Sequence, residues 1–150
     1  MQLTQYTDFS LRTLVYLAIQ PERETLCRIA EITEVFGLSS NHVSKFIHHL
    51  GKLGYLQTVR GKNGGFKLAV KPVDINIGKV VRQLENTLQP IDCGLGPCVF
   101  LPACKLKGAL GEAVNAYLAV LDKYSLDDII TNKSDLRACI ATIPTVVELL

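Results

Sequence analysis

Apolar residues recur at steps of three and four over five stretches of this chain, which is the spacing that amphipathic helices require. The stretches are residues 1–20, 25–37, 39–53, 77–86 and 105–124. Pro21 ends the first of them, and Gly37 is a typical left-handed cap for the second. Asn76 and either Ser39 or Ser40 are candidate caps for the helices that follow them. This pattern predicts a mainly α-helical protein.

Two short segments between the third and fourth predicted helices break the helical spacing, and we expect them to pair as strands. They are Leu56–Val59 and Phe66–Val70, and they flank the basic segment Arg60–Gly65. Within that segment Asn63-Gly64 is a strong hairpin-turn signal. A short helix, a glycine-containing turn, a second helix and a basic hairpin are together typical of a winged helix-turn-helix.

The distribution of charge favours DNA as a partner. No acidic residue lies between Glu34 and Asp74, whereas all three histidines fall in that interval and the rest of the chain is net acidic. The outer face of the third predicted helix includes His48 and His49. The side chains that we expect to face base edges or nearby phosphates are Ser39, Ser40, Asn41, His42 and Lys45. Those expected to contact the DNA backbone or the minor groove are Lys52, Arg60 and Lys62.

The helix predicted over residues 105–124 has two apolar stripes, and such a helix needs two neighbours. One neighbour is its own domain and the other a second copy of the helix, so we expect a homodimer that reads a palindromic operator in double-stranded DNA. Ser125 and Asp128 resemble a capping box that starts a short helix. The predicted organisation is a winged-helix domain over 1–88, a cysteine-rich loop over 89–104, a dimerisation helix and short following helix over 105–132, and a tail over 133–150.

Three of the five cysteines, Cys93, Cys98 and Cys104, lie close together in one segment. Two glycines and two prolines share this segment and favour an irregular loop that can bring three sulfurs around one point. Three thiolates around one point are a ligand set for a metal ion or an iron–sulfur cluster. Cys104 also precedes a predicted helix and stands beside Lys105, and both features favour the thiolate form.

Hydropathy and cysteine use are typical of a cytoplasmic protein without a membrane partner. No segment is long enough to span a bilayer, and the apolar run Leu14–Ile19 is too short for a secretory signal. In the cytoplasm, clustered cysteines favour a metal or redox site over a structural disulfide framework. The histidines all lie on one predicted DNA-facing helix, so no catalytic Cys–His or Ser–His–Asp arrangement can form and we expect no enzymatic activity.

Other uses of the cysteines stay open at this point. A thiol–disulfide regulator would control DNA binding by redox chemistry of the same residues without any metal. A zinc-stabilised DNA-binding protein is a further alternative, although the cysteine segment lacks a nearby histidine to complete a four-coordinate site. Cys27 lies on the second predicted helix, where we interpret it as a small core residue.

Three motifs occur in order along the chain. They are Met1-Gln2-Leu3-Thr4 with Tyr6-Thr7-Asp8, then Val59-Arg60-Gly61-Lys62-Asn63-Gly64-Gly65, then Cys93, Cys98 and Cys104-Lys105-Leu106. Together they resemble the nitric-oxide-sensitive repressors of the Rrf-type family of bacterial iron–sulfur winged-helix regulators. The resemblance implies a homodimeric repressor that binds a palindromic operator while it contains an iron–sulfur cluster, and that releases DNA when nitric oxide attacks the cluster.

The resemblance also implies a ligand set. Cluster-biogenesis regulators of the same family, which remain an alternative, place a histidine three residues after the third cysteine, where this chain has Lys107. In the nitric-oxide-sensitive members an acidic side chain from the other subunit can complete the cluster, and Asp8 matches that position. The implied ligands are Cys93, Cys98, Cys104 and Asp8, with [4Fe–4S] favoured over [2Fe–2S]. The competing interpretation of Asp8 is a simple ion pair with Arg12, one helical turn away.

Overall fold

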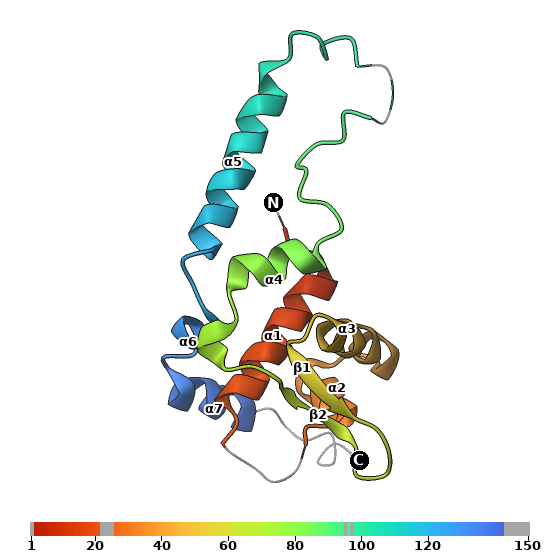
Figure 1. The fold of residues 1–150 in the computed structure, drawn as a ribbon, viewed down its shortest axis with the longest axis vertical. Helices are drawn as coiled ribbons and strands as arrows, with labels where there is room; N and C mark the ends of the chain where they lie inside the picture. The colour runs from red at the N-terminus through yellow and green to blue at the C-terminus, as the bar shows by residue number, and fades with distance from the viewer. Residues whose placement is uncertain (1, 22–25, 95, 97, 143–150) are drawn as a thin grey trace.

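The computed structural model describes residues 2–21, 26–94, 96 and 98–142 (Figure 1). Its helices are α1 (Gln5–Ile19), α2 (Ile29–Phe36), α3 (Ser40–Lys52), α4 (Ile77–Leu84), α5 (Lys105–Leu121), α6 (Leu126–Ile129) and α7 (Lys133–Ala141). Its strands are β1 (Leu56–Val59) and β2 (Gly65–Leu68), and a 3-10 helix, η1, covers Pro72–Asp74. Helices therefore dominate the fold and one small antiparallel sheet completes it, which confirms the predicted fold class.

The core gathers around α1, which packs against α3, α4, α6, α7 and β2. Thr4 caps this helix by accepting a hydrogen bond from the Thr7 amide, and the helix ends before Pro21, as predicted. Leu14 is fully buried and Ile19 is 1% exposed. Burying such side chains contributes about 1.5–3 kcal/mol each, so α1 is the element on which the other helices are assembled.

The pair α2 and α3 forms the predicted helix-turn-helix. Gly37 ends α2 with a φ of 64°, the left-handed conformation that favours glycine, and Ser39 caps α3 by accepting the His42 amide. The buried side chains of α3 are Val43, Phe46, Ile47 and Leu50. One part of the prediction is wrong, because α2 begins only at Ile29 and Cys27 precedes the helix.

Cys27 is extended because it pairs with the wing. Its amide donates to the Phe66 carbonyl at 3.0 Å, and the Phe66 amide donates to the Cys27 carbonyl at 2.8 Å. Cys27 is 2% exposed, so its interpretation as a core residue is confirmed. The wing itself is β1 paired antiparallel with β2, with Leu56 opposite Leu68. The second strand lies slightly earlier in the chain than Phe66–Val70, the predicted range.

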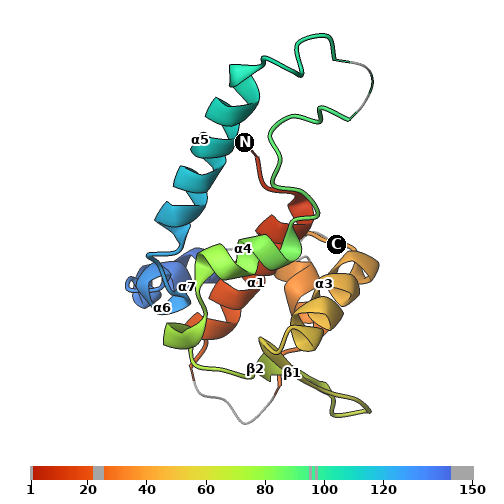
Figure 2. The same cartoon turned by 45° about the horizontal axis from the view of Figure 1, so that its top comes forward.

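Helix α5 extends away from the rest of the molecule, beyond α4 (Figures 1 and 2). The structure describes all of α5, and Leu118 is its one buried residue. Leu106 and Val120, from the predicted apolar stripes, are 59% and 50% exposed. In a single chain α5 therefore leaves most of its apolar surface in contact with water. Among the described residues, no helix combines the length and hydropathy needed to cross a membrane.

The helices after α5 return to the core. The predicted capping box is confirmed at α6, where Ser125 and Asp128 each bond the other's backbone amide. Leu126 is fully buried. Helix α7 packs on α1, and Arg137 donates to the Ile19 carbonyl. The sequence pattern predicts no helix in the tail, so α7 is an addition from the structure. Residues 143–150 of the tail lie outside the described residues.

Candidate functional site

The loop that links α4 to α5 carries three of the five cysteines and runs from the body, at the end of α4, to the far end of α5 (Figure 1). Its described residues form turns and no helix or strand, as the glycines and prolines predicted; positions 95 and 97 lie outside them. One local turn is closed by Asp92, whose carboxylate accepts the Gly94 amide at 2.7 Å. A segment of this kind can change conformation without breaking a helical or sheet hydrogen-bond ladder.

The three cysteines are free thiols, with Cys93 and Cys104 half-buried and Cys98 exposed. Within the part of the chain that the structure describes, no group of three histidine, cysteine or acidic side chains is arranged to hold a metal ion. The predicted gathering of three sulfurs is therefore absent from this conformation. Val99 and Phe100 are 81% and 72% exposed, so side-chain packing does not fold the loop. Metal–thiolate bonds are the interactions that would order it.

Cys104 occupies the N-cap position of α5, as predicted. Lys105 and Lys107 follow it in the first turn of that helix. The N-terminal end of α5 and two lysine side chains thus place positive charge near this sulfur. Such an environment favours an anionic group bound near Cys104.

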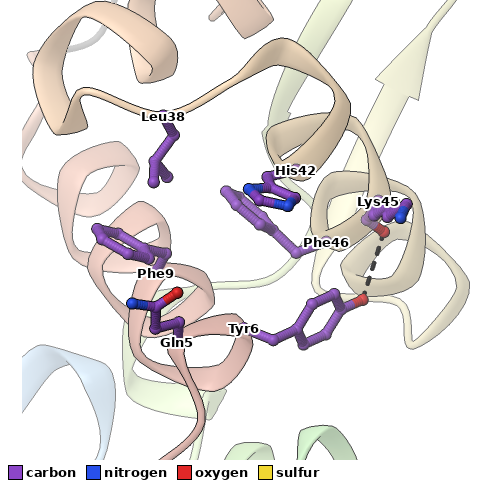
Figure 3. A pocket seen from close by; sticks show the side chains of 7 residues that line it. All are labelled: Gln5, Tyr6, Phe9, Leu38, His42, Lys45 and Phe46. Atoms are coloured by element: carbon purple, nitrogen blue, oxygen red, sulfur yellow. Dashed lines mark hydrogen bonds between the residues drawn. The ribbon is translucent and has the colours of Figure 1, made fainter.

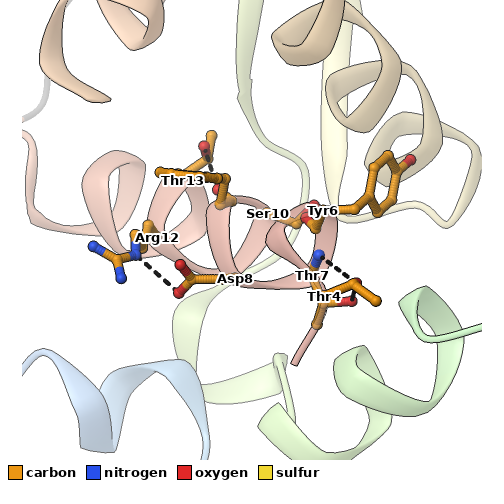
Figure 4. Close-up of polar contacts among 8 residues, drawn as sticks. Thr4, Tyr6, Thr7, Asp8, Ser10, Arg12 and Thr13 are labelled. Atoms are coloured by element: carbon orange, nitrogen blue, oxygen red, sulfur yellow. Dashed lines mark hydrogen bonds and ion pairs between the residues drawn. The ribbon is translucent and has the colours of Figure 1, made fainter. Parts of the chain in front are cut away.

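Asp8 lies on α1 in an ion pair with Arg12, whose Nε donates to Oδ1 at 2.8 Å (Figure 4). The Asp8 side chain is 40% exposed and the Arg12 side chain 57% exposed, so solvent screens this pair. Among the described residues, Asp8 also belongs to no group of three or more histidine, cysteine or acidic side chains that could hold a metal ion. The ion pair between Asp8 and Arg12 is therefore present. The ligand role of Asp8 toward a second subunit stays a prediction.

The predicted DNA contacts all belong to α3, its N-cap or the wing, and all are exposed: Ser39, Ser40, Asn41, His42, Lys45, Lys52, Arg60 and Lys62. The sequence placed His49 on the same outer face, and that placement is wrong. His49 is half-buried, and its Nδ1 lies 3.0 Å from the hydroxyl of Tyr6 on α1. The reason is that Tyr6 packs beside α3 and offers the imidazole a hydrogen-bond partner.

Tyr6 connects helix α1 to helix α3, the second helix of the helix-turn-helix. Its ring meets Phe46 edge-on with centroids 6.3 Å apart, and its hydroxyl also donates to the Lys45 carbonyl at 3.4 Å (Figure 3). Burial raises the pKa of Tyr6, so the hydroxyl stays protonated and able to donate. A pocket of about 300 Å³ beside this contact is lined by side chains of α1, α3 and Leu38 (Figure 3). No local sequence signal pairs Tyr6 with His49, which are far apart in the chain.

The tip of the wing differs from the turn that Asn63-Gly64 predicted. The Gly64 amide donates to the Gly61 carbonyl at 2.9 Å, so Lys62 and Asn63 form the centre of the turn. Gly61 has a φ of 109°, and a Cβ on Gly64 would lie 2.4 Å from the Val59 carbonyl oxygen. Glycine is required on both sides of the turn, and Lys62 is presented at its tip.

Sequence reasoning also missed a buried polar stripe on α1. Thr7, Ser10 and Thr13 are fully buried (Figure 4). The Ser10 hydroxyl donates to the Tyr6 carbonyl at 2.7 Å, and the Thr13 hydroxyl donates to the Phe9 carbonyl at 2.8 Å. Small side chains here let neighbouring elements approach α1 closely. The regular three-residue spacing of these hydroxyl residues is the signal that could have revealed the stripe.

Comparison with known proteins identifies relatives of this chain over most of its length. The family model Rrf2, described as an iron-dependent transcriptional regulator, matches residues 3–132. The HTH-type transcriptional regulator NsrR of Shouchella clausii is 48% identical over 141 residues, covering 92% of this chain and 94% of the relative. The protein of the same name from Bacillus subtilis is 48% identical over 139 residues, covering 91% and 94%.

Among solved structures, that of T. potens IscR resembles this chain with a TM-score of 0.66 at 25% identity, covering 88% of each chain. This likeness supports the winged-helix fold derived above. Because the relatives are named as transcriptional regulators, a non-enzymatic role, the prediction that the chain is not an enzyme is confirmed. The family resemblance seen in the three motifs is confirmed as well.

Proposed function

We propose that this chain, which belongs to the Rrf2 family of transcriptional regulators, represses genes as a homodimer that depends on an iron–sulfur cluster and responds to nitric oxide. The observation that carries the proposal is the position of the cysteine loop. It leaves the winged-helix body after α4 and returns through α5 (Figure 2). Cys93, Cys98 and Cys104 therefore lie on a segment that is attached at both ends to the DNA-binding domain.

The donor set fits an iron–sulfur cluster. Cys93, Cys98 and Cys104 are free, at least partly exposed and located on a loop that can rearrange without disturbing the core. The α5 N-terminus with Lys105 and Lys107 offsets the negative charge of an anionic cluster. When bound, the cluster supplies iron atoms that react with nitric oxide. Of the two cluster types, we propose [4Fe–4S] over [2Fe–2S].

We assign the fourth position to Asp8 of the partner subunit. Arg12 engages the carboxylate through Oδ1, so the other oxygen can bind iron while the ion pair persists. A carboxylate is a harder and weaker ligand for iron than a thiolate, so the position that it occupies is the one most readily exchanged. The ion pair with Arg12 orients the carboxylate for this task.

On DNA, the exposed face of α3 lies in the major groove with Ser39, Asn41 and Lys45 toward the bases or the flanking phosphates. The wing contributes Arg60 and Lys62, which contact the backbone or the minor groove. The role of the second subunit is to place two such faces at a fixed separation, which a palindromic operator matches.

Dimerisation is assigned to α5, because the described residues of the chain leave a stripe of large apolar side chains on this helix exposed. Leu106 and Val120 together with Tyr124 just beyond the helix expose large apolar side chains along its length. The same helix of a second subunit can cover an exposed apolar stripe of this kind by packing its own apolar stripe against it. The cysteine loop at the end of α5 then lies close to the second subunit.

A rigid cysteine loop thereby fixes the position of the recognition helix α3 in each subunit. When Cys93, Cys98 and Cys104 share ligand bonds, the loop is rigid, and when those bonds are lost the loop is free. A coupling of about 1–3 kcal/mol changes operator affinity by about 5- to 150-fold, which suffices for a genetic switch.

Serine variants of the cysteines test the ligand assignment. Proteins with Cys93→Ser, Cys98→Ser or Cys104→Ser, purified without oxygen, are expected to contain little iron and sulfide and to lack visible absorbance. Cys139→Ser is the matched control, since Cys139 is an exposed thiol on α7, outside the loop. Asp8→Ala is expected to retain a cluster that a chelator removes faster.

The proposal is wrong if the three loop variants contain as much iron and sulfide as the wild-type protein. Colourless wild-type protein whose DNA binding follows the concentration of dithiothreitol would instead favour a thiol–disulfide regulator.

A further inference from the structure

The cysteine arm, by which we mean residues 86–121, is attached to both ends of α4. It starts after Glu85 at the C-terminal end of α4, and it returns at Asp122 beside the first turn of the same helix (Figure 2). Next to the second attachment, Asn76 and Ser125 form an antiparallel bridge. The position of α5 relative to the body is thus determined at the start of α4.

Asp122 is the centre of the second attachment. Arg82 on α4 donates two hydrogen bonds to its carboxylate, from Nη1 to Oδ1 at 2.5 Å and from Nη2 to Oδ2 at 2.8 Å. The Asn76 side chain donates to the Asp122 carbonyl at 2.7 Å and accepts the Lys79 amide at 2.9 Å. The side-chain amide of Asn76 therefore bonds both the C-terminal end of α5 and the N-terminal end of α4. The hydrogen bonds from Arg82 lower the pKa of Asp122, so its carboxylate is ionised at neutral pH.

Gly78 shows how closely the two helices meet. A Cβ at this position would lie 2.1 Å from Oδ1 of Asp122 and 2.9 Å from its amide nitrogen. No side chain fits between α4 and the end of α5. Two parallel hydrogen bonds from a planar guanidinium fix direction as well as distance, so the carboxylate and the helix that ends beside it have one orientation.

The other end of α4 is tied to α1. Glu85 accepts hydrogen bonds from the amide and the hydroxyl of Thr4, at 2.8 and 3.0 Å. Thr4 is the N-cap of α1, two residues before Tyr6, which contacts His49 on the recognition helix α3. A continuous set of contacts therefore runs from the end of α5 through α4 and α1 to α3. Its two ends are far apart in sequence, and no local pattern predicts it.

From these contacts we propose that Arg82 and Asp122 are positioning residues that transmit the state of the cysteine arm to the recognition helix. This inference rests on the proposed function. It adds the contact between Arg82 and Asp122, which we call the joint, as the place through which the signal passes. The 17 residues of α5 span about 25 Å, so a rotation of about 5° at the joint moves the Cys104 end by about 2 Å. Conversely, displacing the arm turns α5 about Asp122. The ion pair is half-exposed and adds little to stability, so its main contribution is to geometry.

The test compares Arg82→Gln and Asp122→Asn with the wild-type protein. The measured quantity is the ratio of dissociation constants without and with the cluster, for a duplex that the wild-type protein selects from random-sequence DNA. The wild-type ratio is expected within about 5–150, the range typical of allosteric coupling. Both variants are expected to bring the ratio to near one, with unchanged visible absorbance. The double variant Arg82→Asp with Asp122→Arg is expected to restore part of it.

A second readout uses cluster-free protein. Hydrogen exchange at the Ile77 and Leu126 amides, which bond to the carbonyls of Tyr124 and Ile75, is expected to be up to about fivefold faster in the single variants. Lys133→Gln is the matched control, because Lys133 forms another surface ion pair, with Asp127, and should alter neither readout.

Three results contradict the inference. Wild-type-like affinity ratios in Arg82→Gln and Asp122→Asn show that the joint does not transmit the signal, while the proposed function stands. A wild-type ratio of one removes the proposed function together with the joint. Equal losses in the Lys133→Gln control also contradict a specific role, because they would show a general effect of surface charge.

Discussion

Replacing Gly65 with alanine tests how the wing is fastened to the body. A Cβ at Gly65 would lie 2.4 Å from the Cys27 carbonyl oxygen and 2.8 Å from the Leu26 Cβ, so the bridge between Cys27 and Phe66 must open. Two backbone hydrogen bonds are lost with it, at about 0.5–1.5 kcal/mol each, or about 1–3 kcal/mol together. For a chain of this size that corresponds to a fall in Tm of about 2–12 °C.

The assay is urea and thermal unfolding of cluster-free protein followed by circular dichroism. Gly108→Ala is the control, because nothing lies within 4 Å of a Cβ there and alanine favours a helix by up to about 1 kcal/mol over glycine. The two substitutions are chemically identical and are expected to shift the midpoint in opposite directions. A Gly65→Ala protein that is as stable as the wild type would refute the bridge between Cys27 and the wing.

Three further predictions concern single side chains. Lys62→Ala should weaken binding to all DNA sequences alike and lower the salt slope by about one, measured by fluorescence anisotropy; a changed sequence preference would contradict the wing assignment. Leu126→Ala should cost about 2–5 kcal/mol in urea unfolding, since this side chain is fully buried, and a loss too small to measure would contradict that burial. The pKa of Asp122 is lowered by its hydrogen bonds with Arg82. Its contribution to the free energy of unfolding is therefore fully present above pH 3.8, the ordinary pKa of the carboxyl, and is lost as pH falls through the lowered pKa. Because this half-exposed pair adds little to stability, acid unfolding of Asp122→Asn is expected to show only a slightly weaker loss of stability below pH 3.8 than the wild type, and a steeper loss would contradict the ion pair.

Features that depend on neighbours in sequence were predictable. The caps Ser39 and Asn76 and the left-handed Gly37 are encoded by single residues, and the structure has all three as expected. The burial of one face of α3 followed from its spacing alone, because hydrophobic periodicity and helical pitch coincide.

Features that depend on distant partners were not predictable. Cys27 was placed on a helix because nothing near it in sequence reveals its pairing with Phe66. His49 was placed on the outer face because helical spacing takes no account of Tyr6, which approaches from another element. Bidentate pairing of Arg82 with Asp122 likewise arises only from the packing of α4 against the end of α5.

The candidate ligands illustrate the same limit. Spacing and composition predict that Cys93, Cys98 and Cys104 share an irregular loop, and they do. Where the sulfurs lie within the loop is not encoded by periodicity, and the described residues do not gather them around one point. Under the proposed function, the bonds that gather them are to iron and not to other residues. The ligand role of Asp8 stays a prediction.

The most direct test of the account is operator binding by protein purified without oxygen, measured by gel shift before and after addition of nitric oxide. We expect coloured protein containing iron and sulfide, with affinity for the selected duplex that falls by about 5- to 150-fold once nitric oxide is added. Colourless, iron-free protein that binds the duplex fully and does not respond to nitric oxide would contradict it.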